Sequence, residues 1–238
     1  MDFAIPSHLV DTLAAVDRLL AERIIPAEAA VLEQGFVKAA PLLAELRAAV
    51  QAAGLWGPQI PKDAGGLGLG LVDHALISER IGRSPLGHYA FGCQAPDAGN
   101  LEVLHKWGTA EQKARWMAPL ARGELRSCFS MTEPENAGSN PTLLSCTATL
   151  DGDHWVVDGH KWFTTGADGA AFAIVMAVTN PEATPHARAS MIIVPTDTPG
   201  FELVRNIPIM GDAGGGWASH GEIRYHGCRV PKANLLGP

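Results

Sequence analysis

The chain has 238 residues, 47% of them hydrophobic and 18% charged, which is enough for one large domain or two small domains with a buried core. Its formal net charge of -7, with no cluster of Lys or Arg, argues against a nucleic-acid partner. No apolar run approaches the length of a membrane span. Four scattered cysteines and an N-terminus unlike a signal or transit peptide predict a soluble, cytoplasmic protein, with a mitochondrial or peroxisomal compartment left open.

Apolar residues recur at helical spacing from residue 7 to about residue 123. The first predicted helix, HLVDTLAAVDRLLAERI, has its apolar face at Leu9, Leu13, Val16, Leu20 and Ile24. Pro26 is expected to end or kink this helix. Further helices are predicted over residues 41–54, over 73–83 and from Thr109, which has capping-box spacing to Gln112.

The apolar period changes to two after Gly123. The segment TATLDGDHWVVDGHKWFTT predicts three strands joined by two Asp-Gly turns, and later runs such as AAFAIVMAV and ASMIIVPT predict more strands. The sequence therefore predicts an α+β protein. A helical domain over residues 1–124 is followed by an antiparallel β-barrel or sandwich domain over residues 125–238.

The sequence gives little support to a nucleotide-phosphate loop, a metal site or a catalytic nucleophile. The glycines of KDAGGLGLG, residues 62–70, follow no strand, so they favour a structural loop over a nucleotide-phosphate loop. The nine histidines lack the spacing of a metal site, and no metal is expected. Ser139 lacks the Gly-x-Ser-x-Gly pattern of a nucleophile, and Cys128 lies in a predicted strand as a buried thiol.

Two segments remain as candidates for a binding site: CFSMTEPENAGSN, residues 128–140, and GHKWFTTGA, residues 159–167. Each ends a predicted strand with hydroxyls and small residues, and the second adds an indole ring. Such groups suit a planar, hydrogen-bonding cofactor with a diphosphate tail, for example a flavin. Turns of β domains are also rich in Thr and Gly for reasons of geometry alone, so both interpretations stay open.

The same two segments resemble the flavin-contacting motifs of the acyl-CoA dehydrogenase family. In the first motif a strand leads into Thr-Glu-Pro and then a Gly-Ser turn, and the second motif is Lys-(x)-Trp-x-Thr-x-Gly, where (x) is a residue that KWFTTG lacks. GLWGPQIPKDAGGLGLGLVDHALISERIGRS resembles the family's helical-domain signature, and RVPKANLLG resembles the segment that closes its β domain. The resemblance covers nearly the whole chain. It implies the first two domains of that family, FAD as cofactor, and α,β-desaturation of an acyl-CoA thioester.

The resemblance also implies which residues contact FAD. The expected flavin-binding residues are Phe129, Met131, Thr132, Gly138, Ser139, Trp162 and Thr164. The backbone of Phe129 is expected to touch the flavin, and Met131 and Thr132 to contact the pyrimidine side of the ring. Gly138 and Ser139 are expected at the diphosphate, Trp162 beside the ring, and Thr164 as a hydrogen-bond donor to N5. For each residue the alternative is a satisfied strand-end hydroxyl or a core aromatic.

Three departures from the family pattern stand out. TEPENAGSN is one residue longer than the commonest form and KWFTTG one residue shorter, as in the branch acting on long or unusual acyl chains. MGDAGGGWASHGE lacks the usual Arg-x-Ser pattern. In the family the catalytic base lies in a C-terminal four-helix domain, which is expected to begin where this sequence ends, so no catalytic residue is assigned. Glu133 and Glu135 are poor substitutes, because a base must reach the substrate proton.

Several functions fit this combination. The preferred interpretation is the N-terminal and middle portion of an FAD-dependent acyl-CoA dehydrogenase. The alternatives are a subunit of a heteromeric dehydrogenase, a non-catalytic acyl-CoA or flavin binding module, and an acyl-CoA oxidase or flavin monooxygenase of the same fold. The implied partners are an acyl-CoA substrate, electron-transfer flavoprotein, and further copies in a dimer or tetramer or a partner subunit.

Overall fold

The computed structural model describes residues 4–238 and divides into two compact units, one up to residue 98 and one from residue 99. The first unit is helical, and the second combines short helices with a mixed sheet. This order of helices and then a mostly antiparallel sheet confirms the predicted fold class. The domain boundary expected near Glu124, where the apolar period changes, stays a prediction.

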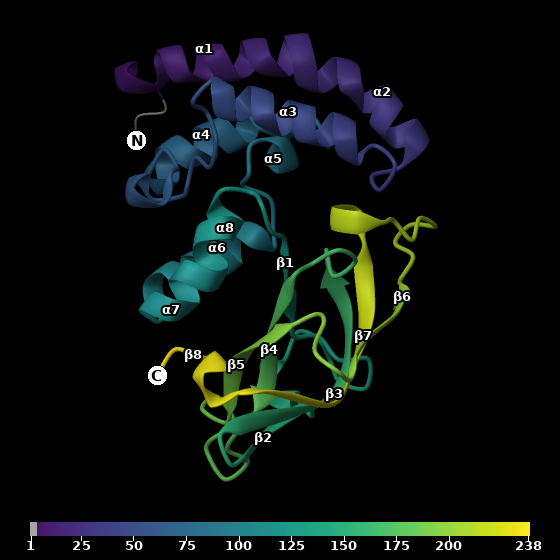
Figure 1. Cartoon of the computed structure of the whole chain (residues 1–238). Coiled ribbons are helices and arrows are strands. Elements are labelled where there is room, and N and C mark those ends of the chain that lie inside the picture. Colours follow the sequence, from purple (N-terminus) through teal and green to yellow (C-terminus); the bar gives the residue numbers. More distant parts are fainter. Residues whose placement is uncertain (1–3) are drawn as a thin grey trace. The chain divides into compact units, whose positions relative to one another are not determined.

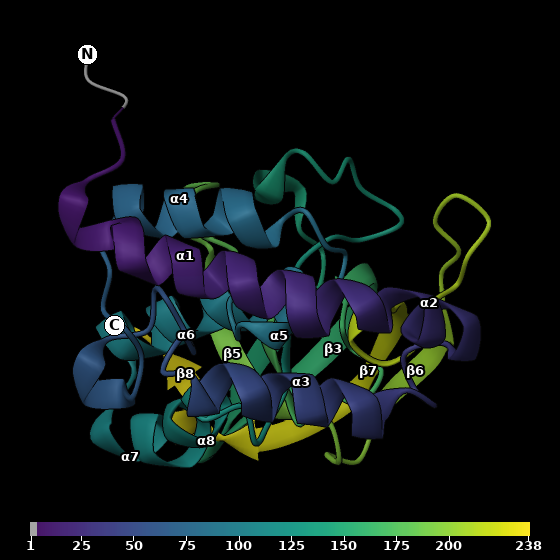
Figure 2. The same cartoon turned by 90° about the horizontal axis from the view of Figure 1, so that it is seen from above.

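The first unit is built from α1 (Val10–Leu19), α2 (Ile25–Gln34), α3 (Ala40–Ala52), α4 (Leu71–Ile81) and α5 (Gly87–Ala90). Helices α1 and α4 lie side by side (Figures 1 and 2). All five residues of the predicted apolar face, Leu9, Leu13, Val16, Leu20 and Ile24, are at most 4% exposed. The helical periodicity of the sequence therefore identified the buried face correctly.

Pro26 neither ends the first helix nor leaves it regular. A π-helical turn over Leu20–Ile24 joins α1 to α2, and Pro26 lies in the first turn of α2. Proline lacks an N–H and its ring crowds the carbonyl one turn earlier, which a wider π turn relieves. The same arrangement recurs in the second unit, where the π turn Lys113–Met117 precedes Pro119 in α8 (Ala118–Ala121).

The glycine-rich loop of residues 62–70 folds back on the segment before it. The N–H groups of Gly66, Leu67 and Gly68 donate to the carbonyls of Pro61, Gly57 and Ile60, at 3.1, 3.1 and 2.8 Å. These amides are thus used within the loop and are not available to a phosphate. The structural role expected for this loop agrees with these contacts.

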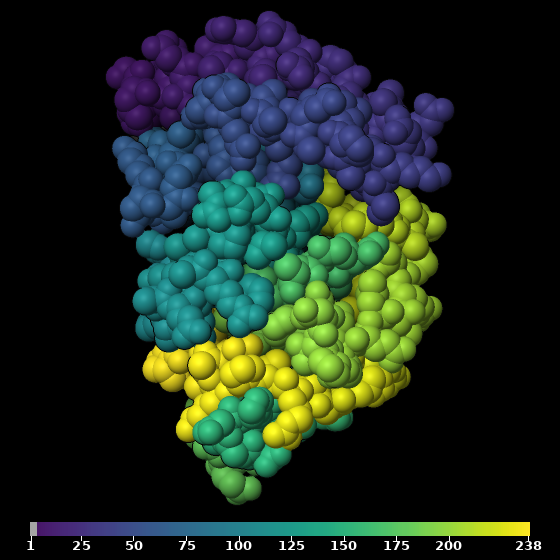
Figure 3. All heavy atoms as spheres, viewed as in Figure 1, coloured from purple at the N-terminus to yellow at the C-terminus, as the bar shows by residue number. Residues whose placement is uncertain are grey.

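The second unit begins within α6 (Asp97–Trp107) and continues through α7 (Ala110–Gln112) to α8. The predicted capping box forms, because Thr109 and Gln112 exchange hydrogen bonds of 3.0 and 3.2 Å. The Gln112 amide also donates to the carbonyls of Ala233 and Leu235, at 2.8 and 2.9 Å. The C-terminal segment therefore lies against these helices, as the yellow and teal surfaces show (Figure 3).

The sheet has the strand order β6-β7-β3-β2-β4-β5-β8, with β1 paired to β4. Most neighbours are antiparallel, but β1 and one residue pair of β2 run parallel to β4. The buried core between the strands is apolar and includes Val157, Ala173, Val175, Ile192 and Ile223. The strands span Ser127–Ser130 (β1), Thr147–Asp151 (β2), His154–Thr165 (β3), Phe172–Val178 (β4), Ala189–Pro195 (β5), Phe201–Asn206 (β6), His220–Pro231 (β7) and Leu235–Leu236 (β8).

The second predicted Asp-Gly turn is wrong. Asp151 and Gly152 do turn the chain between β2 and β3, but Asp158 and Gly159 lie inside the continuous strand β3, at an irregularity in its pairing with β7. A Cβ on Gly159 would lie 2.6 Å from the Cβ of Cys146. Glycine is therefore needed here for a close approach inside the sheet and not for a turn.

Among residues 4–238, no helix is long and apolar enough to cross a membrane. This finding agrees with the absence of a membrane-length apolar run in the sequence.

The close packing of the glycine-rich loop predicts a stability effect. A Cβ on Gly66 would lie 2.3 Å from the carbonyl oxygen of Ile60, so we expect Gly66→Ala to lower the free energy of unfolding by about 1–3 kcal/mol. Chemical denaturation followed by circular dichroism measures this change. The control is Gly99→Ala in α6, where a Cβ meets nothing within 4 Å and is expected to be neutral or mildly stabilising. Equal midpoints for Gly66→Ala and the wild type would contradict the packing argument.

Candidate functional site

Strand β1 brings the first candidate segment between β4 and β3. Its residues pair in parallel with β4, with Phe129 opposite Ile174 and Ser130 opposite Val175. Ser130 is buried, whereas Phe129, Met131 and Thr132 are half-buried. The strand stops after Ser130, and the chain enters a loop that runs to β2 at Thr147.

The carboxylate of Glu133 holds this loop together. Its oxygens accept hydrogen bonds from the amides of Ser145 and Cys146, at 2.7 and 2.8 Å. The Ser145 hydroxyl and the Asn136 amide each donate to it at 2.7 Å. One buried side chain near the start of the loop therefore fixes the far end of the loop, where the chain re-enters the sheet.

The fifth donor to Glu133 is the ammonium group of Lys161 on β3, at 2.9 Å. The same ammonium donates to the carbonyl oxygen of Met131, at 2.8 Å. The two side chains are 0% and 1% exposed. Burial by itself raises the pKa of Glu133, but the hydrogen bonds from Lys161, Ser145 and Cys146 outweigh it and lower this pKa to about 2.

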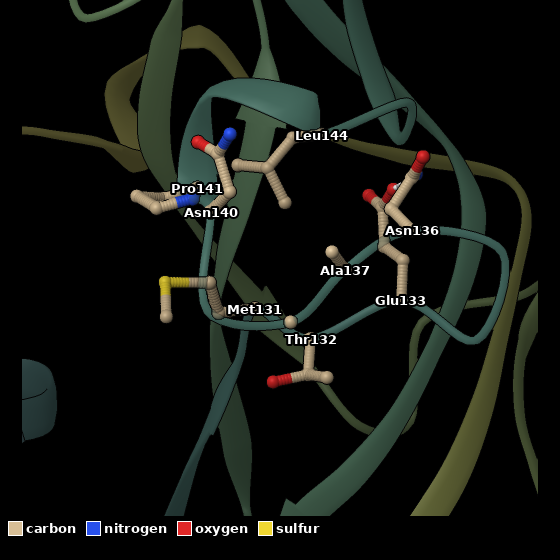
Figure 4. Close-up of a pocket in the computed structure, with 9 residues that line it drawn as sticks. Met131, Thr132, Glu133, Asn136, Ala137, Asn140, Pro141 and Leu144 are labelled. Atoms are coloured by element: carbon tan, nitrogen blue, oxygen red, sulfur yellow. Dashed lines mark hydrogen bonds between the residues drawn. The ribbon is translucent and has the colours of Figure 1, made fainter.

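Thr132, beside β3, presents unused hydrogen-bonding groups. Its carbonyl oxygen accepts a hydrogen bond from the N–H of Trp162, at 2.9 Å. Its amide and hydroxyl have no hydrogen-bond partner within residues 4–238. Figure 4 shows that the side chains of Thr132 and Glu133 leave the loop on opposite sides. Thr132 is therefore held by its carbonyl while its two donors remain available to a ligand.

A β-bulge shapes the second candidate segment. The pairing of β3 with β7 shifts register between Lys161 and Thr164, and Phe163 between them has φ of 50°. Few non-glycine residues adopt this left-handed conformation, and it is concentrated at functional sites. Phe163 is 41% exposed, and its ring centroid lies 4.8 Å from that of Trp162. The bulge thus presents two adjacent aromatic rings at the surface of the second unit.

The bulge also decides which threonine faces outward. Side chains of a regular strand alternate, so a buried Lys161 would place Thr164 outside. The extra residue reverses this order: Thr164 is 1% exposed, with its hydroxyl 3.3 Å from that of Ser130. Thr165 is half-buried, and its hydroxyl lies 3.0 Å from Nδ1 of His220. Of the two threonines only Thr165 is partly exposed, and the predicted donor Thr164 is turned inward.

Gly138 and Ser139 lie on the exposed part of the loop. A Cβ on Gly138 would lie 3.0 Å from the methyl group of Thr132, so the loop packs closely on itself at this glycine. A small recess with a cavity volume of about 10 Å³ lies between Met131, Gly138, Asn140 and Leu144 (Figure 4). A cavity of this volume holds roughly one water molecule, so the recess by itself does not enclose a ligand.

The two carboxylates of the loop, Glu133 and Glu135, differ in their surroundings. Glu133 has five donors and a pKa of about 2, which makes it a very weak base near neutral pH. Glu135 is exposed and lies 2.7 Å from Nδ1 of His160. Among residues 4–238 there is no group of three His, Cys, Asp or Glu side chains that could hold a metal ion. The hydroxyls, backbone donors and aromatic rings of the two segments can bind and orient a ligand.

The structure brings Met131, Thr132 and Trp162 together, as the sequence reasoning expected, and their role as flavin contacts stays a prediction. Sequence reasoning missed Lys161, Phe163 and Thr165. One signal in the sequence was that KWFTTG is one residue shorter than the usual motif. The buried charge of Lys161 could have been suspected from its place in an apolar, strand-forming segment.

Comparisons with known proteins agree with this architecture. The family model of the acyl-CoA dehydrogenase N-terminal domain matches residues 9–124, and that of the middle domain matches residues 128–226. The FadE2 protein of Mycobacterium tuberculosis, described as an acyl-CoA dehydrogenase, is 38% identical over 100% of this chain and 59% of its own length.

Comparison with solved structures also finds acyl-CoA dehydrogenases. A Mycobacterium abscessus protein described as an acyl-CoA dehydrogenase has a TM-score of 0.91 and 37% identity, over 99% of this chain and 62% of its own. A chain in a structure named for the electron transferring flavoprotein of Acidaminococcus fermentans has a TM-score of 0.79 and 26% identity, over 100% of this chain and 60% of its own. The sequence spans about three-fifths of the length of these relatives, and it belongs to the acyl-CoA dehydrogenase family.

Proposed function

We propose that this chain holds FAD for the α,β-desaturation of an acyl-CoA thioester. The observation that carries the proposal is Thr132, a half-buried residue whose amide and hydroxyl have no partner within residues 4–238. The ring edge of a flavin offers carbonyl and nitrogen acceptors, which need such donors. When bound, FAD supplies the hydride acceptor of the reaction.

The proposed flavin contacts come from both candidate segments. Thr132 donates to the pyrimidine edge, and Met131 and Phe129 border it from the loop and from β1. Gly138 and Ser139, on the exposed small-residue turn, lie toward the diphosphate. Trp162 and Phe163 offer their faces beside the ring, which supports an aromatic contact at the bulge.

The hydroxyl at N5 is proposed to be that of Thr165, in place of the sequence-based candidate Thr164. A ligand reaches the Thr164 hydroxyl only if this buried side chain turns outward, whereas Thr165 is accessible already. Burial lowers the pKa of His220, so its imidazole is neutral near pH 7. With the proton on Nδ1, His220 donates to the Thr165 oxygen and leaves the Thr165 hydroxyl proton for the flavin.

The remaining parts of the reaction belong to the same proposal. The α-proton is removed by a carboxylate outside the described residues, because neither Glu133 nor Glu135 is suited to the task. Acyl-CoA is the substrate, electron-transfer flavoprotein the electron acceptor, and a further copy or a partner subunit completes the assembly. The four described cysteines are all buried free thiols, which agrees with the proposed cytoplasmic location.

Native mass spectrometry of the protein from its own source tests the cofactor assignment. We expect a species that retains FAD, and additional polypeptide mass that supplies the catalytic carboxylate. Denaturing the same sample should release a compound with the absorption spectrum of FAD. A folded protein that carries no flavin, and does not quench FAD fluorescence when titrated with it, would contradict the proposed function.

A matched pair of variants tests the choice between the two threonines. Thr165→Val removes an accessible hydroxyl, so we expect the dissociation constant of FAD to rise about 5- to 30-fold, as a lost hydrogen bond of roughly 1–2 kcal/mol requires. Thr164→Val keeps the shape of a side chain that faces inward, and we expect a change of less than about twofold. Fluorescence titration measures both constants. A large effect of Thr164→Val with none for Thr165→Val would restore the original assignment.

A further inference from the structure

Lys161 and Glu133 form a fully buried ion pair that no step of the proposed reaction uses. The two charged atoms lie 2.9 Å apart, and the side chains are 0% and 1% exposed. Taking both charges out of water is unfavourable by several kcal/mol, and well-packed apolar residues would often be at least as stable. Because burying this pair is unfavourable, we looked for a role of the pair other than stability.

The pair joins three short segments at one point. Lys161 donates to the carbonyl of Met131, and the next residue, Trp162, donates through its N–H to the carbonyl of Thr132. Two consecutive residues of β3 therefore hold two consecutive residues of the loop. Glu133 then connects this point to Ser145 and Cys146, just before β2.

Lys161 is also the residue at which the bulge of β3 begins. The position of its ammonium group therefore relates the unpartnered donors of Thr132 on one segment to Phe163 and Thr165 on the other. A planar ring can meet both segments only if their separation is correct, and misplacement by about 1 Å is enough to weaken such a site strongly.

We propose that the Lys161–Glu133 pair is a positioning device for the flavin site, which sets the distance between the Thr132 donors and the bulge of β3. This inference rests on the proposed function. Lys161 is completely buried, so it cannot itself touch a ligand, and it acts through Thr132. The pair is neutral as a whole, so it acts by geometry and not by adding charge at the ring.

The titration of Glu133 agrees with this role. Its pKa of about 2 keeps the carboxylate charged throughout the range from pH 5 to pH 8. The positioning contact therefore stays intact in this range. The titration of Glu133 should make no contribution to the pH dependence of flavin affinity between pH 5 and pH 8.

The main experiment measures FAD affinity and the visible spectrum of bound flavin in three variants. Lys161→Met replaces the ammonium by an apolar end of similar length, and Glu133→Gln neutralises the carboxylate with little change of shape. Arg229→Met, which removes an exposed pair with Asp151 elsewhere on the sheet, is the control. We expect the dissociation constant of FAD to rise at least tenfold in the first two variants, with a shifted flavin band, and to change less than twofold in the control.

A double-variant cycle separates positioning from simple stability. If Lys161 acts through Thr132, Thr132→Val should weaken FAD binding markedly in the wild type but by less than twofold once Lys161→Met is present. Independent effects would multiply instead. The inference would be overturned if the effects of Thr132→Val and Lys161→Met on the dissociation constant of FAD multiplied. It would also be overturned if a folded Lys161→Met variant kept wild-type affinity and spectrum. Either result would leave the proposed function intact.

The remaining outcomes are also decisive. Lack of flavin binding by the wild-type protein would refute the proposed function itself and, with it, this inference. If Lys161→Met and Glu133→Gln both lose their far-ultraviolet circular dichroism, the pair is a stability element and the positioning role is wrong. If only one variant folds, its affinity and spectrum decide between the two roles.

Discussion

The buried contact between the Lys161 ammonium and the Glu133 carboxylate is the constraint on which the candidate site depends. It connects the loop after β1, the start of β2 and the bulge of β3 through side-chain and backbone hydrogen bonds of 2.7–2.9 Å. Removing one partner leaves a buried, uncompensated charge, which destabilises proteins by roughly 3–5 kcal/mol. The loop therefore has one well-defined conformation even though much of it lies at the surface.

The rest of the sheet supplies a rigid frame for this contact. β3 is a twelve-residue strand whose first part pairs with β2 and β7, and Lys161 further along it pairs with Ile223 of β7. β1 pairs with β4, whose residues are almost all buried, so the point at which the loop begins is fixed too. Sites built on such strands hold their geometry better than sites built on loops alone, and here the loop obtains its precision from strand residues.

Local signals in the sequence predicted most of the fold. The helical period found the buried face from Leu9 to Ile24, and the spacing of Thr109 and Gln112 found the capping box. Both depend on residues a few positions apart. The same reasoning failed for Asp158 and Gly159, because their conformation depends on the distant residue Cys146. Contacts of that kind leave no periodic trace in a sequence.

The site was predictable in outline but not in detail. A short segment with hydroxyls and small residues marked the loop around Thr132, and the neighbouring aromatic segment was recognised with it. The inward turn of Thr164 was not predictable, because strand alternation assumes a regular ladder and the bulge after Lys161 adds one residue. The ion pair was missed because its partners lie 28 positions apart in the chain.

A crystal structure of the protein with bound FAD is the measurement that tests the account most directly. The account predicts that the amide and hydroxyl of Thr132 lie at hydrogen-bond distance, roughly 2.7–3.2 Å, from the edge of the isoalloxazine ring, with Phe163 and Thr165 beside it. It also predicts that the Lys161–Glu133 contact is unchanged from the structure described above. Isoalloxazine density remote from Thr132, or a site in which Thr132 binds only water, would contradict it.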